Sequence, residues 1–180
     1  KDIILGLKFA FSYFSILPIK FDNSVDLSKK EIINYLIFFL PFVGAVLSFL
    51  TIISFNLLES LSWLAAIICA FLYMMLYGFI HTEAILDVVD ALYAKHGGKD
   101  AYEIIKEPTI GAMGFLYALA FVSIKVAAIS MLLLNDLFLE LICIAIISRV
   151  SVQFLVKIKE FKSSFVGLMK ESFKSFKISF

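Results

Sequence analysis

The chain has 180 residues, of which 62% are hydrophobic and only 17% are charged. Soluble domains contain about 45–50% apolar residues, so this composition excludes an ordinary soluble protein. The formal net charge of +1 provides no basic surface, and we expect no nucleic-acid partner. Because the length suits one domain, residues 1–180 are expected to form a single integral membrane domain.

The first apolar stretch, residues 3–19, is short and contains Lys8. A helix that crosses the bilayer needs about 20 mostly apolar residues. This stretch is therefore predicted to be a short helix that spans the membrane, re-enters it or lies at its interface. It lacks a small-residue cleavage site, so no removable signal peptide is expected.

Longer apolar runs follow at residues 31–58, 61–80, 110–134 and 137–156. Each is long enough for a membrane span. The tail over 161–180 alternates apolar residues with Lys and Ser, a pattern typical of amphipathic helices on a membrane surface. The predicted fold is all-α, a polytopic transmembrane helical bundle with four spans, a short N-terminal helix and a C-terminal amphipathic helix.

The loops between these runs differ in their lysine content. Segments 20–30, 81–109 and 157–180 each carry several lysines, whereas the turns near Glu59 and at 135–140 carry no Lys or Arg. Lysine-rich loops of membrane proteins face the cytoplasm. The three lysine-rich segments are therefore predicted to be cytoplasmic.

The longest loop begins with an acidic stretch, residues 81–92. It is predicted to continue the helix of 61–80 beyond the membrane surface. Glu83, Asp87 and Asp90 then fall within an arc of roughly 60° on one helix face. Like charges one turn apart destabilise a helix, so the cluster needs a countercharge. Carboxylates are ligands that Mg²⁺ or Mn²⁺ prefer, and a solvated acidic face paired with lysines such as Lys95 is the alternative.

The same loop ends near a glycine-containing stretch. Residues 96–98, His-Gly-Gly, are expected to stop the acidic helix, and a short helix is predicted at 100–106. Gly111 and Gly114 follow at the mouth of the next span. Their lack of a side chain allows close approach of either a substrate or a neighbouring helix.

Three further polar residues are candidates for function. His81 is a candidate base or metal ligand, with a plain interfacial role as the alternative. Lys125 and Arg149 lie within apolar runs, where charge is costly and is usually functional or paired. Arg149 lies about 12 Å from the cytoplasmic end of its helix at 1.5 Å per residue, so it either snorkels or reaches toward an anionic substrate.

These motifs resemble those of the cobalamin synthase family, the adenosylcobinamide-GDP ribazoletransferases. Residues 81–92 resemble the family motif H-L-D-G-L-A-D-T-A-D-A-L, and residues 106–114 are similar to K-D-S-R-I-G-A-F-G. Residues 14–19 resemble the opening F-L-T-R-L-P-V, and residues 39–44 resemble F-P-L-V-G. Ser148-Arg149 falls where the family has an arginine in a late span.

The chain also departs from the family pattern. Glu83 replaces an aspartate, and Thr109 and Ile16 replace two arginines. The family's C-terminal apolar region, with its G-D-x-L-G-A-like stretch, has no counterpart here. The sequence is therefore identified as a divergent, shortened or truncated member.

The resemblance implies a bacterial inner-membrane transferase of cobalamin biosynthesis, with its active segment 81–109 facing the cytoplasm. It would join adenosylcobinamide-GDP to α-ribazole, or its 5′-phosphate, and release GMP. Lipid is an expected partner, and the sequence is compatible with a homo-oligomer. The expected site comprises Mg²⁺ (or Mn²⁺) on Glu83, Asp87 and Asp90, catalytic Asp90 and His81, and substrate-binding Lys95, Lys106, Glu107 and Arg149.

Two other functions compete with this interpretation. A CDP-alcohol phosphotransferase would carry D-G-x-x-A-R and G-x-x-x-D-x-x-x-D patterns, which the sequence lacks. A non-catalytic transporter component would use the acidic face as an ion site. Metal-dependent release of GMP by the purified protein would separate the three.

Overall fold

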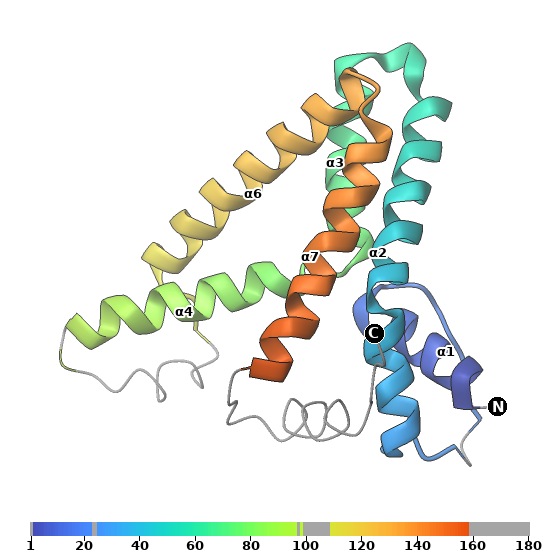
Figure 1. The fold of residues 1–180 in the computed structure, drawn as a ribbon. Coiled ribbons are helices and arrows are strands. Elements are labelled where there is room, and N and C mark those ends of the chain that lie inside the picture. Colours follow the sequence, from blue (N-terminus) through green and yellow to red (C-terminus); the bar gives the residue numbers. More distant parts are fainter. Residues whose placement is uncertain (1, 23–24, 97, 99–108, 159–180) are drawn as a thin grey trace.

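The computed structural model describes residues 2–22, 25–96, 98 and 109–158, and these residues form helices and connecting turns (Figure 1). No strand occurs in this part of the chain, so the all-α prediction is confirmed. The elements are α1 (Asp2–Phe14), α2 (Lys30–Leu57), the 3-10 turn η1 (Glu59–Leu61), α3 (Trp63–Leu76), α4 (Ile80–His96), α6 (Ala112–Leu134) and α7 (Phe138–Ile158).

Helices α2, α6 and α7 are each long and apolar enough to cross a membrane. Helices α3 and α4 meet that test only as a pair, which is bent by 80°. The 14 residues of α3 extend about 21 Å, which is less than the ~30 Å hydrocarbon core. The helical membrane bundle is confirmed, with three spans or up to four if the bent pair is one.

The prediction that the helix of 61–80 continues into the acidic stretch is wrong. Helix α3 ends at Leu76, and the chain turns through left-handed conformations at Gly78 (φ 69°) and Phe79 (φ 52°). Glycine adopts this conformation without steric cost. The Ile16 amide also donates a 2.9 Å hydrogen bond to the Leu76 carbonyl, which satisfies an acceptor at the helix end.

The N-terminal helix α1 lies against the first half of α2 rather than crossing the bundle (Figure 1). Its 13 residues extend about 20 Å, too short to span the hydrocarbon core. Gly6 makes the close contact feasible, since a Cβ there would meet the backbone carbonyl of Ile32 at 3.0 Å. The predicted helices at 100–106 and 161–180 lie outside the described residues.

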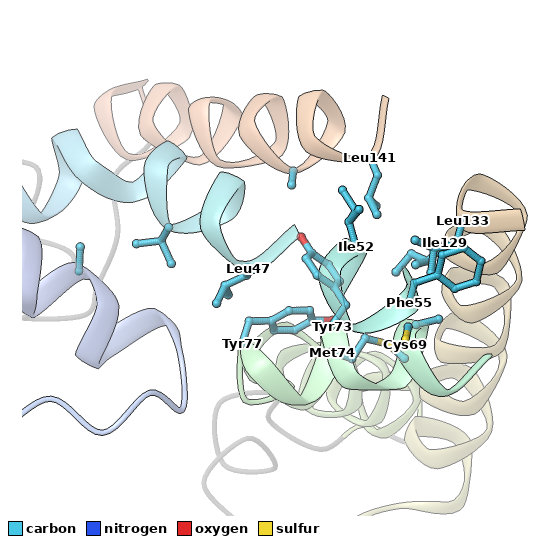
Figure 2. Close-up of a cluster of buried hydrophobic side chains, with 14 of the residues drawn as sticks. Leu47, Ile52, Phe55, Cys69, Tyr73, Met74, Tyr77, Ile129, Leu133 and Leu141 are labelled. Atoms are coloured by element: carbon cyan, nitrogen blue, oxygen red, sulfur yellow. The ribbon is translucent and has the colours of Figure 1, made fainter. Parts of the chain in front are cut away.

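The core lies where α2 and α3 pack against each other and against the adjoining ends of α6 and α7 (Figure 2). Leu47, Met74 and Leu133 from three of these helices are fully buried. In contrast, the outer faces of α6 and α7 expose large apolar side chains such as Ile124 and Ile147. Such faces suit contact with lipid.

Helices α6 and α7 meet at the turn that joins them and diverge toward their other ends (Figure 1). Helix α4 leaves the end of α3, crosses below this opening and packs against the N-terminal half of α6. The 80° bend thus places His81, in the first turn of α4, at the same cavity as Arg149 of α7, and the later turns of α4 pack against α6.

Candidate functional site

A cavity of about 400 Å³ lies between α3, α6 and α7, at the point where α4 begins. Its lining combines polar residues from all four helices with aliphatic residues of α6 and α7. The polar side chains that line the cavity are Tyr73, Tyr77, His81, Lys125, Ser148 and Arg149.

Three aromatic rings form one side of this cavity. Tyr73 of α3 and Tyr77, the residue that follows this helix, lie side by side with ring centroids 5.6 Å apart (Figure 2). The Tyr77 and His81 rings follow at 6.1 Å. The three residues are four apart in sequence, and the turn at Gly78 keeps His81 next to Tyr77 although the helix axis changes direction.

Two cations face these rings from the other two helices. The Lys125 ammonium donates a 2.8 Å hydrogen bond to the Tyr77 hydroxyl and lies 4.6 Å from the centroid of that ring. The Arg149 guanidinium donates to the Tyr73 hydroxyl at 3.3 Å and to the Ala145 carbonyl at 3.0 Å. Among the described residues, no Asp or Glu lines the cavity.

Arg149 points into the bundle because Gly44 of α2 leaves room for it. A Cβ at position 44 would lie 2.7 Å from Cδ of Arg149 and 2.8 Å from the Ala145 carbonyl oxygen. The glycine therefore lets α7 approach α2 and lets the arginine side chain pass between them.

A smaller cavity of about 20 Å³ adjoins the first, and residues from four motif-bearing segments line it. Phe14 comes from the opening segment 14–19 and Leu40 from segment 39–44. His81 begins the acidic stretch, and Arg149 belongs to the late span. Segments that are up to 135 residues apart in sequence thus meet around His81 and Arg149.

At the other end of α4, Asp90 joins the acidic stretch to the glycine-containing stretch. Its two carboxylate oxygens accept hydrogen bonds from the amides of Gly111 (2.7 Å) and Gly114 (2.8 Å). These amides lie at the start of α6, where backbone donors lack helical partners and negative charge is favoured. A Cβ at Gly114 would lie 2.5 Å from the carboxylate, so the glycines serve close helix approach.

The other two acidic residues lie between these two ends. Glu83 is exposed and Asp87 is half-buried. Within the described part of the chain, no three His, Cys, Asp or Glu side chains are placed to hold one metal ion. The described residues therefore do not form a metal site in which protein side chains supply all the ligands. However, Mg²⁺ is usually held by one or two carboxylates together with substrate phosphates, and Glu83 and Asp87 fit that arrangement.

The remaining predicted residues are not gathered at the cavity. Lys95 is exposed and follows His81 by 14 residues, about 21 Å along α4, and it does not line the cavity with Arg149. Lys106 and Glu107 lie outside the described residues. Tyr73 and Tyr77 were not identified as site residues from the sequence. The signal that could have revealed them is that Tyr73, Tyr77 and His81 follow one another at intervals of four residues. Lys125 was singled out from the sequence, but its contact with Tyr77 was not predicted.

A family model described as cobalamin-5-phosphate synthase matches residues 6–178. The chain belongs to this family. It is 28% identical over 154 residues to an adenosylcobinamide-GDP ribazoletransferase of Clostridium perfringens (strain SM101), covering 83% of the chain and 59% of the relative. A relative of the same name from Acinetobacter baumannii is 32% identical over 145 residues, covering 78% and 57%. No solved structure matches the chain.

The chain spans about three-fifths of the length of these curated relatives. Its membership in the cobalamin-5-phosphate synthase family confirms the resemblance drawn from the motifs. The structure adds their spatial relation. In this member of the family, the motif segments meet at two places on α4, the cavity at His81 and the Asp90 contact nine residues later.

Proposed function

We propose that the chain joins adenosylcobinamide-GDP to α-ribazole, or to its 5′-phosphate, and releases GMP. The observation that supports this most is the meeting of the motif segments around His81 and Arg149. In the reaction, a ribose hydroxyl that is free in both α-ribazole and its 5′-phosphate attacks the phosphorus that bears cobinamide. A new phosphate ester bond forms, the bond to the GMP phosphate breaks, and the hydroxyl proton passes to a base.

The substrate diphosphate requires positive charge. Arg149 offers a planar guanidinium whose paired N–H groups match phosphate oxygens. It is proposed to bind the diphosphate, with Lys106, Glu107 and Lys95 as further substrate contacts on the cytoplasmic segment. Phosphoryl transfer depends mainly on positioning and on neutralising charge, which is what a directed arginine supplies.

Mg²⁺, or Mn²⁺, is the proposed cofactor, held by Glu83 and Asp87 with Asp90 next to them. When bound, the ion neutralises charge on the diphosphate. Asp90 already accepts two backbone hydrogen bonds, so Glu83 and Asp87 have the greater freedom to meet the ion.

His81 and Asp90 are the candidates for accepting the hydroxyl proton. His81 lines the cavity that holds Arg149, whereas Asp90 anchors α6. His81→Gln is therefore expected to reduce turnover while leaving thermal stability unchanged. Asp90→Asn should lower both together.

The enzyme is proposed to lie in the bacterial inner membrane, in contact with lipid, as a monomer or a homo-oligomer. Segments 20–30, 81–109 and 157–180 would face the cytoplasm. Thiol labelling of intact cells, after Cys69 and Cys143 are replaced by alanine, tests this orientation. A cysteine at position 59 should be labelled and one at position 95 should be protected; the reverse result would invert the topology.

The function itself is tested with the purified chain in neutral detergent. Adenosylcobinamide-GDP, α-ribazole and Mg²⁺ are supplied, and GMP and the joined product are measured. We expect equal amounts of both, dependent on ribazole and abolished by a chelator. GMP release that ignores ribazole, or no release by a chain that is folded and binds Mg²⁺, would refute the transferase.

A further inference from the structure

Lys125 lies in the middle of α6, a helix long enough to span the membrane, and Arg149 lies within α7. Charges at such positions are costly unless they are paired. Both side chains turn into the same cavity, where two positive charges repel each other. The cavity therefore concentrates positive charge in an apolar part of the bundle.

The groups of the described chain that contact these cations are neutral. The Tyr77 ring and hydroxyl receive Lys125, and the Tyr73 hydroxyl and the Ala145 carbonyl receive Arg149. Cation–π and hydroxyl contacts offset part of the desolvation, but they cancel no charge. With no carboxylate among the described residues of the lining, an anionic ligand is the group that would complete the site.

The shape of the cavity indicates what the anion is attached to. A guanidinium and an ammonium together suit a phosphate group, which offers several acceptor oxygens. The volume of about 400 Å³ exceeds what a bare phosphate fills, and aliphatic side chains on the same faces of α6 and α7 as the cations also line the cavity. These include Ile129, Leu132 and Ile144.

We propose that Lys125 and Arg149 bind the phosphate group of an amphiphilic phosphate ester whose apolar portion packs between α6 and α7. Lys125 thereby acquires a ligand-binding role that no motif assigns to it. The chemistry is shared by a membrane lipid headgroup and by a free phosphate ester. The inference concerns binding alone. If the chain binds phosphate at this cavity but releases no GMP, the proposed transferase function is refuted and the proposed phosphate site stands.

The test uses the whole chain in neutral detergent. Thermal unfolding is followed while inorganic phosphate or hexyl phosphate is titrated at constant ionic strength with chloride, which gives a dissociation constant by linkage. Lys125→Met removes the charge while keeping an unbranched side chain, Lys125→Arg restores it, and Lys20→Met is the matched control at an exposed lysine outside the cavity.

We expect hexyl phosphate to bind more tightly than inorganic phosphate. Lys125→Met should weaken binding by about tenfold or more, the scale of one charged hydrogen bond, with Lys125→Arg and Lys20→Met close to wild type. Prior loading with phosphatidylglycerol distinguishes the sources. If the lipid abolishes hexyl phosphate binding and phosphatidylcholine does not, the headgroup is the ligand; if binding persists, a free ester is.

A second measurement needs no variant. Hexyl phosphate should protect Lys125, but not Lys20, from amine acylation in the wild-type chain, as read by mass spectrometry. Equal acylation with and without the ligand would overturn the proposal. The proposal would also be overturned if phosphate and chloride stabilised the chain equally, or if wild type and Lys125→Met bound phosphate with equal affinity. Each result would mean that Lys125 only forms its structural contact with Tyr77.

Discussion

Charges of opposite sign lie beside the first turn of α4 and in its later part, and they are satisfied to different extents. At the later end, both oxygens of Asp90 accept backbone hydrogen bonds from the first turn of α6. At the first turn, His81 adjoins a cavity where Lys125 and Arg149 meet only neutral groups of the described chain. A fully satisfied charge holds structure together, whereas charge without a counterion in an apolar setting is ready for a ligand.

The difference assigns separate roles to the two motif stretches of this family member. The Asp90 end sets the position of α6 relative to α4, and with it the distance between α6 and α7. The cavity beside the first turn of α4 is where a ligand that enters between α6 and α7 would bind. Mutations at the Asp90 end should therefore change stability first, and mutations at the cavity end should change binding and turnover without unfolding the chain.

The largest effect is expected for Gly114→Ala. The new Cβ would lie 2.5 Å from the Asp90 carboxylate, which forces α4 and α6 apart and breaks both hydrogen bonds. Two hydrogen bonds to a charged group are together worth about 3 kcal/mol. Thermal unfolding in detergent should show a loss of that size, with Ala112→Ser in the same turn as the control. An unchanged melting temperature would mean that Asp90 does not anchor α6.

Arg149→Lys should have the next largest effect, and on binding rather than stability. Lysine keeps the charge but loses the paired planar donors, so GMP release should fall about 30-fold at limiting substrate. Lys106→Arg, which keeps a cation, is the control and should stay within about threefold of wild type. If GMP release fell equally in the two variants, Arg149 would not bind the substrate phosphates through its paired donors.

The inward direction of Arg149 shows how far the sequence argument reaches. The cost of an unpaired charge within a span predicts that Arg149 turns inward, and the structure places it in the cavity, but the sequence does not show how the side chain finds room. That room depends on Gly44, which lies 105 residues earlier and makes space only once α2 and α7 are packed. A glycine within an apolar helix has no sequence feature that reveals its partner.

The spans themselves were predictable because lipid requires long apolar runs, and α2, α6 and α7 follow those runs closely. The break between α3 and α4 was not. Gly78 sits in an apolar run where a glycine is ordinary, and the Ile16 amide that pairs with the end of α3 lies about 60 residues earlier in the sequence. Similarly, the shared helix of Glu83, Asp87 and Asp90 was predictable, but the contact of Asp90 with α6 was not.

The smallest effect is expected for Asp87→Asn, and it tests the part of α4 between the two ends. Glu83 and Asp87 are one turn apart, and like charges at that spacing cost about 0.2–0.5 kcal/mol. In the absence of divalent ions, the variant should therefore be slightly more stable than wild type. Added Mg²⁺ should raise the melting temperature of wild type and have little effect on the variant.

The sign of this pair of changes is what makes the experiment decisive. A carboxylate that only stabilises the fold would give a less stable variant without Mg²⁺, and a solvated acidic face would give two chains with the same response to the ion. Lys95→Gln is the control, because it removes a charge of α4 far from Glu83 and should leave the Mg²⁺ response intact. Gain of stability without the ion, together with loss of the ion's effect, identifies a metal ligand.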